Sequence, residues 1–178
     1  RPPKNDGMSR RGKQRQRGFS LMELAVVAVI LSLLLGVLLE RLTFYQEAAE
    51  RARFEATLQG YKTALQIRLA ELMLERREGE ARRLEAENPT LWLSEKPTDY
   101  GGSYPPRPEP GVWYFDESSR ELVYVANSAR RLAVEPRNGM KQLRFAAKVV
   151  YQDVYVSGRP IRSIAGVALR PAADYRWP

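Results

Sequence analysis

Three patterns of apolar and polar residues follow one another along the chain. Residues 19–39 are almost wholly apolar, residues 40–86 mix apolar and charged positions at helical spacing, and residues 112–178 contain runs that alternate with a period of two. These patterns are typical of a membrane-spanning helix, an amphipathic helix and half-buried strands, respectively. Their order predicts a long N-terminal helix followed by a sheet.

The apolar segment 19–39 has the length of a membrane crossing. At 1.5 Å per residue it spans about 30 Å, the thickness of a hydrocarbon core. A secretory signal has a shorter apolar core and then a cleavage site made of small residues. Here Leu38-Leu39-Glu40-Arg41 follows instead, so we predict a transmembrane helix that is not removed.

The helical pattern continues beyond the apolar segment, and no proline occurs from Glu40 until Pro89. One apolar stripe recurs at steps of three and four residues; it comprises Leu58, Tyr61, Leu65, Leu69 and Leu72. Such spacing places side chains on one helix face. We predict an amphipathic helix over 40–86 that contacts a sheet, with its regular part ending near Leu74.

The C-terminal half predicts strands. Residues 87–111 are rich in Pro, Gly and Tyr and are expected to form a loop. Two hairpins are expected in 112–178, one joining 112–116 to 121–125 and one joining 141–156 to 161–170 through "SGRP". The outer strand should present one face made of Ile161, Ser163, Ala165, Val167 and Leu169, and "PAADYRWP" is expected to be a tail.

The predicted fold class is therefore α+β: a long N-terminal helix, half transmembrane and half amphipathic, packed on an antiparallel sheet of about four strands.

The net charge of +8 is concentrated at the N-terminus. Residues 1–18 contain seven basic residues against Asp6, a net +6, so the remainder carries +2. The basic residues are Arg1, Lys4, Arg10, Arg11, Lys13, Arg15 and Arg17. A basic run directly before an apolar span keeps the N-terminus cytoplasmic, which makes a nucleic-acid interaction the weaker interpretation. Met8 is a candidate start, which leaves the leader beginning at Arg1 or at Met8.

"RGFSLMEL", from Arg17 to Leu24, resembles the signal of type IV prepilins and type II secretion pseudopilins. That family combines a basic leader, a glycine, a phenylalanine and a glutamate five residues into the mature chain. Gly18, Phe19 and Glu23 match this pattern, and the apolar segment follows directly. The resemblance implies a pilin-like fold, removal of leader 1–18 by a prepilin peptidase between Gly18 and Phe19, and methylation of the new N-terminus at Phe19.

Glu23 is the unusual residue of the apolar segment, because a carboxylate within a membrane helix is costly. One interpretation is an interfacial carboxylate solvated by lipid headgroups. The other follows from the resemblance: Glu23 neutralises the N-terminal amine of a neighbouring subunit and so fixes the register of assembly.

The composition limits the possible chemistry. The chain has no cysteine and no histidine, which removes thiol nucleophiles, histidine bases and Cys/His zinc sites. No paired-carboxylate, phosphate-loop or EF-hand pattern occurs, so we expect no enzymatic activity, no cofactor and no metal site. A calcium loop at Asp99, Asp116 and Glu117 is a minor alternative.

Two functions remain open. The first is a structural subunit of a pilus or pseudopilus, with a prepilin peptidase, other subunits, an inner-membrane platform and a cytoplasmic ATPase as partners. Its soluble domain would lie in the periplasm. The second is a single-pass anchored binding module that does not polymerise, using an aromatic surface. The candidate aromatics are Trp92, Tyr100, Tyr104, Trp113, Tyr114 and Trp177, for which packing between loop and sheet is the preferred interpretation.

Overall fold

A computed structural model describes residues 20–178 of the chain. Contacts divide it into two units, one ending at Arg41 and the other spanning Leu42–Pro178. The boundary between the units falls inside the helix α1 (Leu21–Leu74). The predicted continuation of the apolar segment into an amphipathic helix is therefore confirmed.

The C-terminal end of α1 is set by backbone hydrogen bonds that the pattern of side chains does not reveal. Arg76 adopts a left-handed conformation with φ 58°. Its N–H donates to Met73 O at 3.1 Å, and Arg77 N–H donates to Leu72 O at 2.8 Å. This pair of bonds is a Schellman motif, which usually carries glycine at the left-handed position. The chain then continues in two short 3-10 helices, η1 (Glu78–Glu85) and η2 (Pro89–Trp92).

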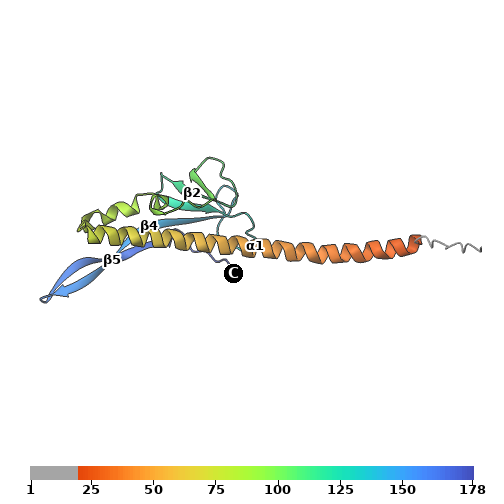
Figure 1. Ribbon diagram of the computed structural model, residues 1–178, viewed down its shortest axis with the longest axis horizontal. Coiled ribbons are helices and arrows are strands. Elements are labelled where there is room, and N and C mark those ends of the chain that lie inside the picture. Colours follow the sequence, from red (N-terminus) through yellow and green to blue (C-terminus); the bar gives the residue numbers. More distant parts are fainter. Residues whose placement is uncertain (1–19) are drawn as a thin grey trace, which may run out of the picture. The chain divides into compact units, whose positions relative to one another are not determined.

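The sheet has five strands in the order of the sequence (Figure 1). They are β1 (Tyr100–Ser103), β2 (Val112–Asp116), β3 (Glu121–Val125), β4 (Gln142–Val156) and β5 (Arg159–Pro171). Strand β1 runs parallel to β2, and the other pairs are antiparallel. The α+β class with a long helix on a mostly antiparallel sheet is confirmed, and so is the first hairpin.

Strand β1 lies in the segment predicted to be a loop, and it accounts for the fifth strand. Its sequence, Tyr-Gly-Gly-Ser, has the composition of a turn. Close packing requires glycine at position 101. A Cβ there would lie 2.5 Å from Tyr114 Cε1 and 2.9 Å from Val112 Cγ1. Glycine in a strand often marks such a close approach, so composition alone gives the wrong assignment.

The second hairpin differs from the prediction in two ways. Its turn is Ser157-Gly158, with φ 51° and 77°, so Arg159 and Pro160 belong to β5. The register also shifts opposite Val150 and Tyr151, which leaves Ala165 as a bulge. A bulge reverses the alternation of side chains. The face predicted from Ile161 to Leu169 is therefore wrong in its outer part.

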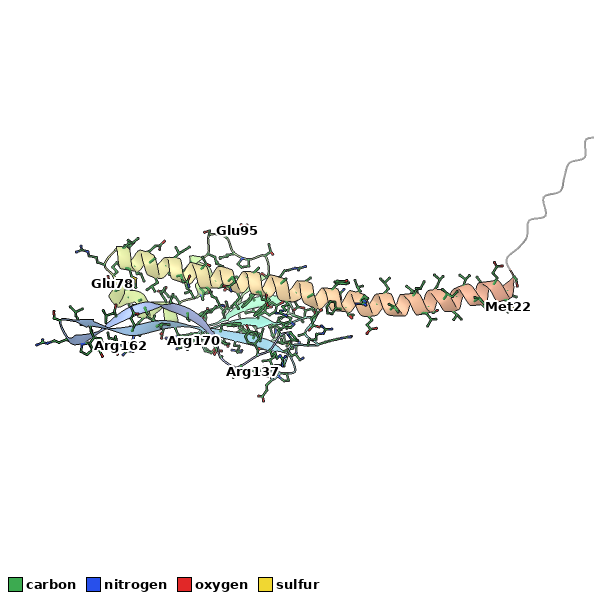
Figure 2. All side chains as sticks on the ribbon, turned by 90° about the horizontal axis from the view of Figure 1, so that it is seen from below. Met22, Glu78, Glu95, Arg137, Arg162 and Arg170 are labelled. Carbon is green, nitrogen blue, oxygen red and sulfur yellow. The ribbon has the colours of Figure 1, made fainter. Side chains whose placement is uncertain are left out.

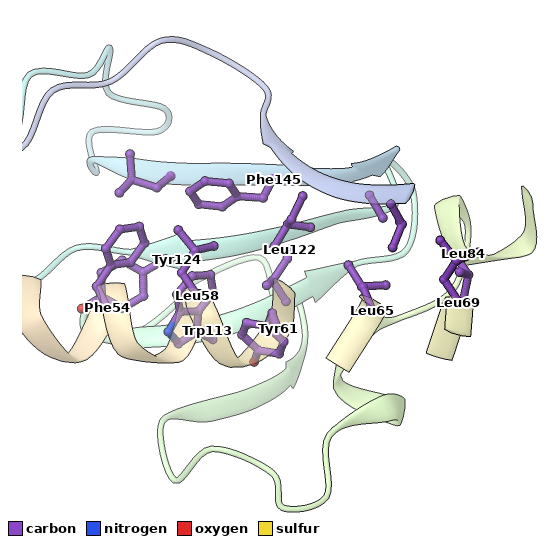
Figure 3. Packing of buried hydrophobic residues seen from close by; sticks show 14 of the residues in the cluster. Phe54, Leu58, Tyr61, Leu65, Leu69, Leu84, Trp113, Leu122, Tyr124 and Phe145 are labelled. Carbon is purple, nitrogen blue, oxygen red and sulfur yellow. The ribbon is translucent and has the colours of Figure 1, made fainter. Parts of the chain in front are cut away.

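The core lies between α1 and one face of the sheet, as the labelled side chains show (Figure 3). The predicted stripe of α1 is buried along its whole length, together with Phe54. The Phe54 ring stacks on Trp113 at 5.4 Å and contacts Tyr124 at 5.1 Å. Trp177 lies in the same cluster, 7 % exposed and 5.4 Å from the Phe54 ring. The prediction that the C-terminal residues form a tail is therefore wrong, because the Trp177 indole packs in the core.

Candidate functional site

The N-terminal turn of α1 places Glu23 at a favourable helix position. Ser20 precedes the helix, and its Oγ accepts a hydrogen bond from Met22 N–H at 3.3 Å. The spacing Ser20-x-x-Glu23 is that of a capping box, and the helix dipole favours a carboxylate in the first turn by about 0.3–1 kcal/mol. Neither interpretation of Glu23 given above includes this local reason. Gly18 and Phe19 lie outside the described residues, as do Arg10, Arg11, Lys13, Arg15 and Arg17.

The first part of α1 exposes a continuous apolar surface. Every side chain from Ser20 to Arg41 is exposed, with Leu21 at 87 % and Leu33 at 68 %. Figure 2 shows these side chains from Met22 onward standing out around the helix. By length and composition α1 contains a segment able to cross a membrane. The Ser32 hydroxyl donates to Ala28 O at 2.7 Å, which satisfies its donor within the helix.

A second exposed surface, which carries no charge, lies in the other unit, on α1 from Tyr45 to Leu74. We call it the outer face of α1. It comprises Tyr45, Ala49, Ala52, Ala56, Gln59, Thr63, Ile67, Ala70 and Leu74, at steps of three and four residues. Each of these residues is exposed and none is charged. Thr63 comes two residues after Tyr61 and two before Leu65 of the buried stripe, about half a turn of helix from each, so the outer face lies on the side of α1 turned away from the sheet.

Charges border the outer face without entering it. Arg51 pairs with Glu55 at 2.8 Å, and Arg68 pairs with Glu71 at 2.9 Å. A helix that covers a sheet normally directs charged residues into the solvent on its opposite side. The uncharged outer face of α1 departs from this pattern. The same three-and-four spacing that predicts the buried stripe also reveals this second one in the sequence.

Two glutamates of α1 hold the loop that follows β3; we call them the glutamate clamp. Glu50 accepts from the Tyr124 hydroxyl at 2.8 Å, from Asn127 N–H at 2.6 Å and from Ser128 N–H at 2.5 Å. These bonds satisfy loop N–H groups that no strand pairs. Burial, reinforced by the Glu50 carboxylate, raises the pKa of Tyr124 well above its usual range.

The other member of the clamp, Glu47, is 8 % exposed. Its Oε1 accepts from Arg131 N–H at 2.8 Å and from Trp177 Nε1 at 3.3 Å. The clamp therefore fixes α1 to both the loop and the C-terminus. The clamp was not predicted, because its partners, three backbone N–H groups and two side chains, lie 74 to 130 residues away along the chain.

The candidate aromatic surface is mostly interior. Trp113, Tyr114 and Trp177 are buried, and Trp92, Tyr100 and Tyr104 pack against the two hydrophobic clusters of the sheet. The preferred interpretation, that these aromatics pack the loop onto the sheet, is confirmed. Among residues 20–178, the aromatic side chains with the largest exposure are Tyr155 at 73 % and Tyr45 at 62 %, neither of which the sequence singled out.

The acidic residues considered for calcium have other partners. Asp116 pairs with Arg144 at 2.9 Å, and Glu117 accepts from the Ser103 hydroxyl at 3.1 Å. Burial opposes ionisation of Asp116, yet hydrogen bonds from Ser118 and Arg144 outweigh it and hold the pKa of Asp116 below its usual range. Burial raises the pKa of Asp99. Within residues 20–178, no group of three or more acidic side chains is arranged to hold a metal ion.

The comparisons with known proteins identify the N-terminal segment. Residues 13–39 match the family model of the prokaryotic N-terminal methylation motif. The match spans the end of the basic leader from Lys13, together with Gly18, Phe19, Glu23 and the apolar segment. No curated protein and no solved structure matched the chain. The chain thus carries a prepilin-type signal of the kind found in type IV pilins and pseudopilins.

Proposed function

We propose that this chain is a structural subunit of a type IV pilus or a type II secretion pseudopilus. In this proposal it is inserted as a single-pass inner-membrane protein with its N-terminus cytoplasmic and its sheet domain periplasmic. A prepilin peptidase removes residues 1–18 and methylates Phe19. Assembly then uses a membrane platform and a cytoplasmic ATPase, and the role of the chain is structural rather than enzymatic.

The observation that carries this proposal is the outer face of α1. A membrane anchor explains exposed apolar residues only within the membrane-spanning segment of α1. The outer face continues from Tyr45 to Leu74, in the unit that also contains the sheet. A helix whose outer side carries no charge can bury that side against a partner as well as the side that faces its own sheet. Packing against the helices of neighbouring subunits would bury the outer face.

The alternative is an anchored binding module that does not polymerise. Such a protein would need the apolar segment as an anchor, but its soluble helix would gain nothing from an uncharged outer face. The aromatic surface that would serve such a module is buried or packed against the core. The filament subunit is therefore the function that the structure supports better.

Thr63→Glu tests the proposal, because Thr63 is exposed at the middle of the outer face. Glutamate is a good helix former, so the domain should fold normally. A charge buried between packed helices costs several kcal/mol, so Thr63→Glu should remove the protein from sheared filaments. The matched variant Thr63→Gln, of nearly the same size and uncharged, should retain most of the incorporation. Equal incorporation of both variants would contradict assembly through the outer face.

Processing is tested separately by the intact mass of the membrane form. We expect a mature chain that begins at Phe19 and is heavier by one methyl group. The control is the same protein from cells that lack prepilin peptidase, which should retain the leader. A chain that keeps residues 1–18 in cells with an active peptidase would refute the assignment of the cleavage site.

A further inference from the structure

The hairpin formed by β4 and β5 extends beyond the rest of the sheet (Figure 1). Strand β3 pairs with β4 only from Gln142 to Phe145, whereas β5 pairs with β4 as far as Val156. Near the turn the apolar side chains are exposed: Tyr155 at 73 %, Val156 at 52 % and Ile161 at 51 %. A two-stranded ribbon is only marginally stable in water unless something packs on it.

The two-residue turn determines which backbone groups of the ribbon point outward. Val156 and Arg159 flank Ser157-Gly158 and form a hydrogen-bonded pair in such a turn. By alternation, Tyr151, Asp153 and Tyr155 direct their N–H and C=O groups away from β5. Val149 confirms this alternation, because its N–H turns away from β5 and donates to Glu85 Oε1 at 2.8 Å.

Glu85 therefore covers the edge of β4 at Val149, whereas residues 152–156 farther along the strand are exposed. We call the backbone of Tyr151–Val156 on the side away from β5 the distal edge of β4. Among residues 20–178, no strand pairs with β4 along this edge. An open edge presents a row of donors and acceptors that another extended strand satisfies.

The other edge of the ribbon is protected. On β5, Pro160 lacks an N–H at an outward position, and the bulge at Ala165 interrupts the regular repeat. Arg159 and Arg162 add charge, and the Arg162 guanidinium lies over the Tyr151 ring at 4.4 Å. A proline, a bulge and charged residues at the edge of a sheet all hinder the addition of another strand. The distal edge of β4, with the sequence YQDVYV, contains no proline and a single charge.

We propose that the distal edge of β4 binds an extended strand of a partner protein by β-strand addition. The edge accommodates about six residues, or about 20 Å of strand. A second copy of this chain fits poorly, because the antiparallel register that uses all three outward residues places Asp153 opposite Asp153, and like charges in that position are destabilising. The partner strand is expected to carry a neutral or basic residue there.

This inference does not depend on polymerisation, because a subunit that remains in the membrane exposes the same edge. It is tested in the full-length protein in intact cells, with Tyr155 replaced by a benzophenone amino acid for photo-crosslinking. Asp153→Pro removes one outward N–H from β4. Arg162→Pro removes the N–H directly opposite, on the protected edge of β5. Asp153→Ala is the control for loss of the side-chain charge.

The expected product is a cross-link to one extended segment of another protein, identified by mass spectrometry. Its yield should fall about tenfold or more in Asp153→Pro, since a backbone hydrogen bond is lost. It should change at most about threefold in Asp153→Ala and Arg162→Pro. Tryptophan fluorescence, to which the buried Trp113 and Trp177 contribute, checks that each variant retains its core. The proposal is overturned by the absence of a cross-link, by a product of twice the chain mass, or by equal losses in Asp153→Pro and Arg162→Pro.

Discussion

Trp177→Ala tests whether the C-terminus belongs to the core. The indole is 7 % exposed and contacts Phe54 and Tyr124, with ring centroids 5.4 and 6.4 Å away. Burying about 150–250 Å² at about 25 cal/mol per Å² corresponds to about 4–6 kcal/mol. Measured losses for Trp→Ala in cores are about 3–5 kcal/mol. We therefore expect Trp177→Ala to lower the free energy of unfolding by about 4 kcal/mol.

Trp177→Phe is the matched variant, because it keeps an aromatic ring and removes the N–H that donates to Glu47 at 3.3 Å. It should cost about 1–1.5 kcal/mol, the usual net value of one hydrogen bond. Amide hydrogen exchange of Val123 and Tyr124 in the detergent-solubilised chain measures both effects. At 1.4 kcal/mol per factor of ten, exchange should accelerate about a thousandfold in Trp177→Ala and about tenfold in Trp177→Phe. Acceleration below tenfold in Trp177→Ala would refute a structural role for the C-terminus.

Two further predictions concern Glu23 and Gly101. Glu23→Ala should leave peptidase processing intact, as judged by the mature mass, while incorporation into sheared filaments falls; normal incorporation would remove the assembly role of this carboxylate. Gly101→Ala should destabilise the domain by about 1–3 kcal/mol in a denaturation series, because its Cβ would meet the Tyr114 ring at 2.5 Å. Gly79→Ala, where a Cβ meets nothing within 4 Å, is its control and should be nearly neutral.

The sequence predicted the features that depend on short-range periodicity. The stripe from Leu58 to Leu72 identified the buried face of α1, and the run from Val112 to Val125 identified the first hairpin. Both follow from neighbours that are two to four residues apart. The prepilin-type signal was also readable, because its parts occur in one fixed order.

The features that the sequence did not predict depend on residues far apart in the chain. Trp177 is buried only because Phe54 and Tyr124 lie beside it, and Glu47 is satisfied only by groups more than 80 residues away. Strand β1 contains two glycines, yet it forms because its backbone pairs with the edge of β2. Long-range pairing of this kind overrides local composition.

The position of the glutamate clamp has a mechanical consequence. The clamp joins α1 to the sheet domain near the residue at which α1 enters that unit. A force that pulls the helix along its axis therefore acts on the clamp and on the buried stripe in shear. Contacts loaded in shear must break together, so resistance depends on their combined unfolding barrier, which governs forced unfolding. The two carboxylates thus help the sheet domain to stay attached to α1 when a force pulls along the helix axis.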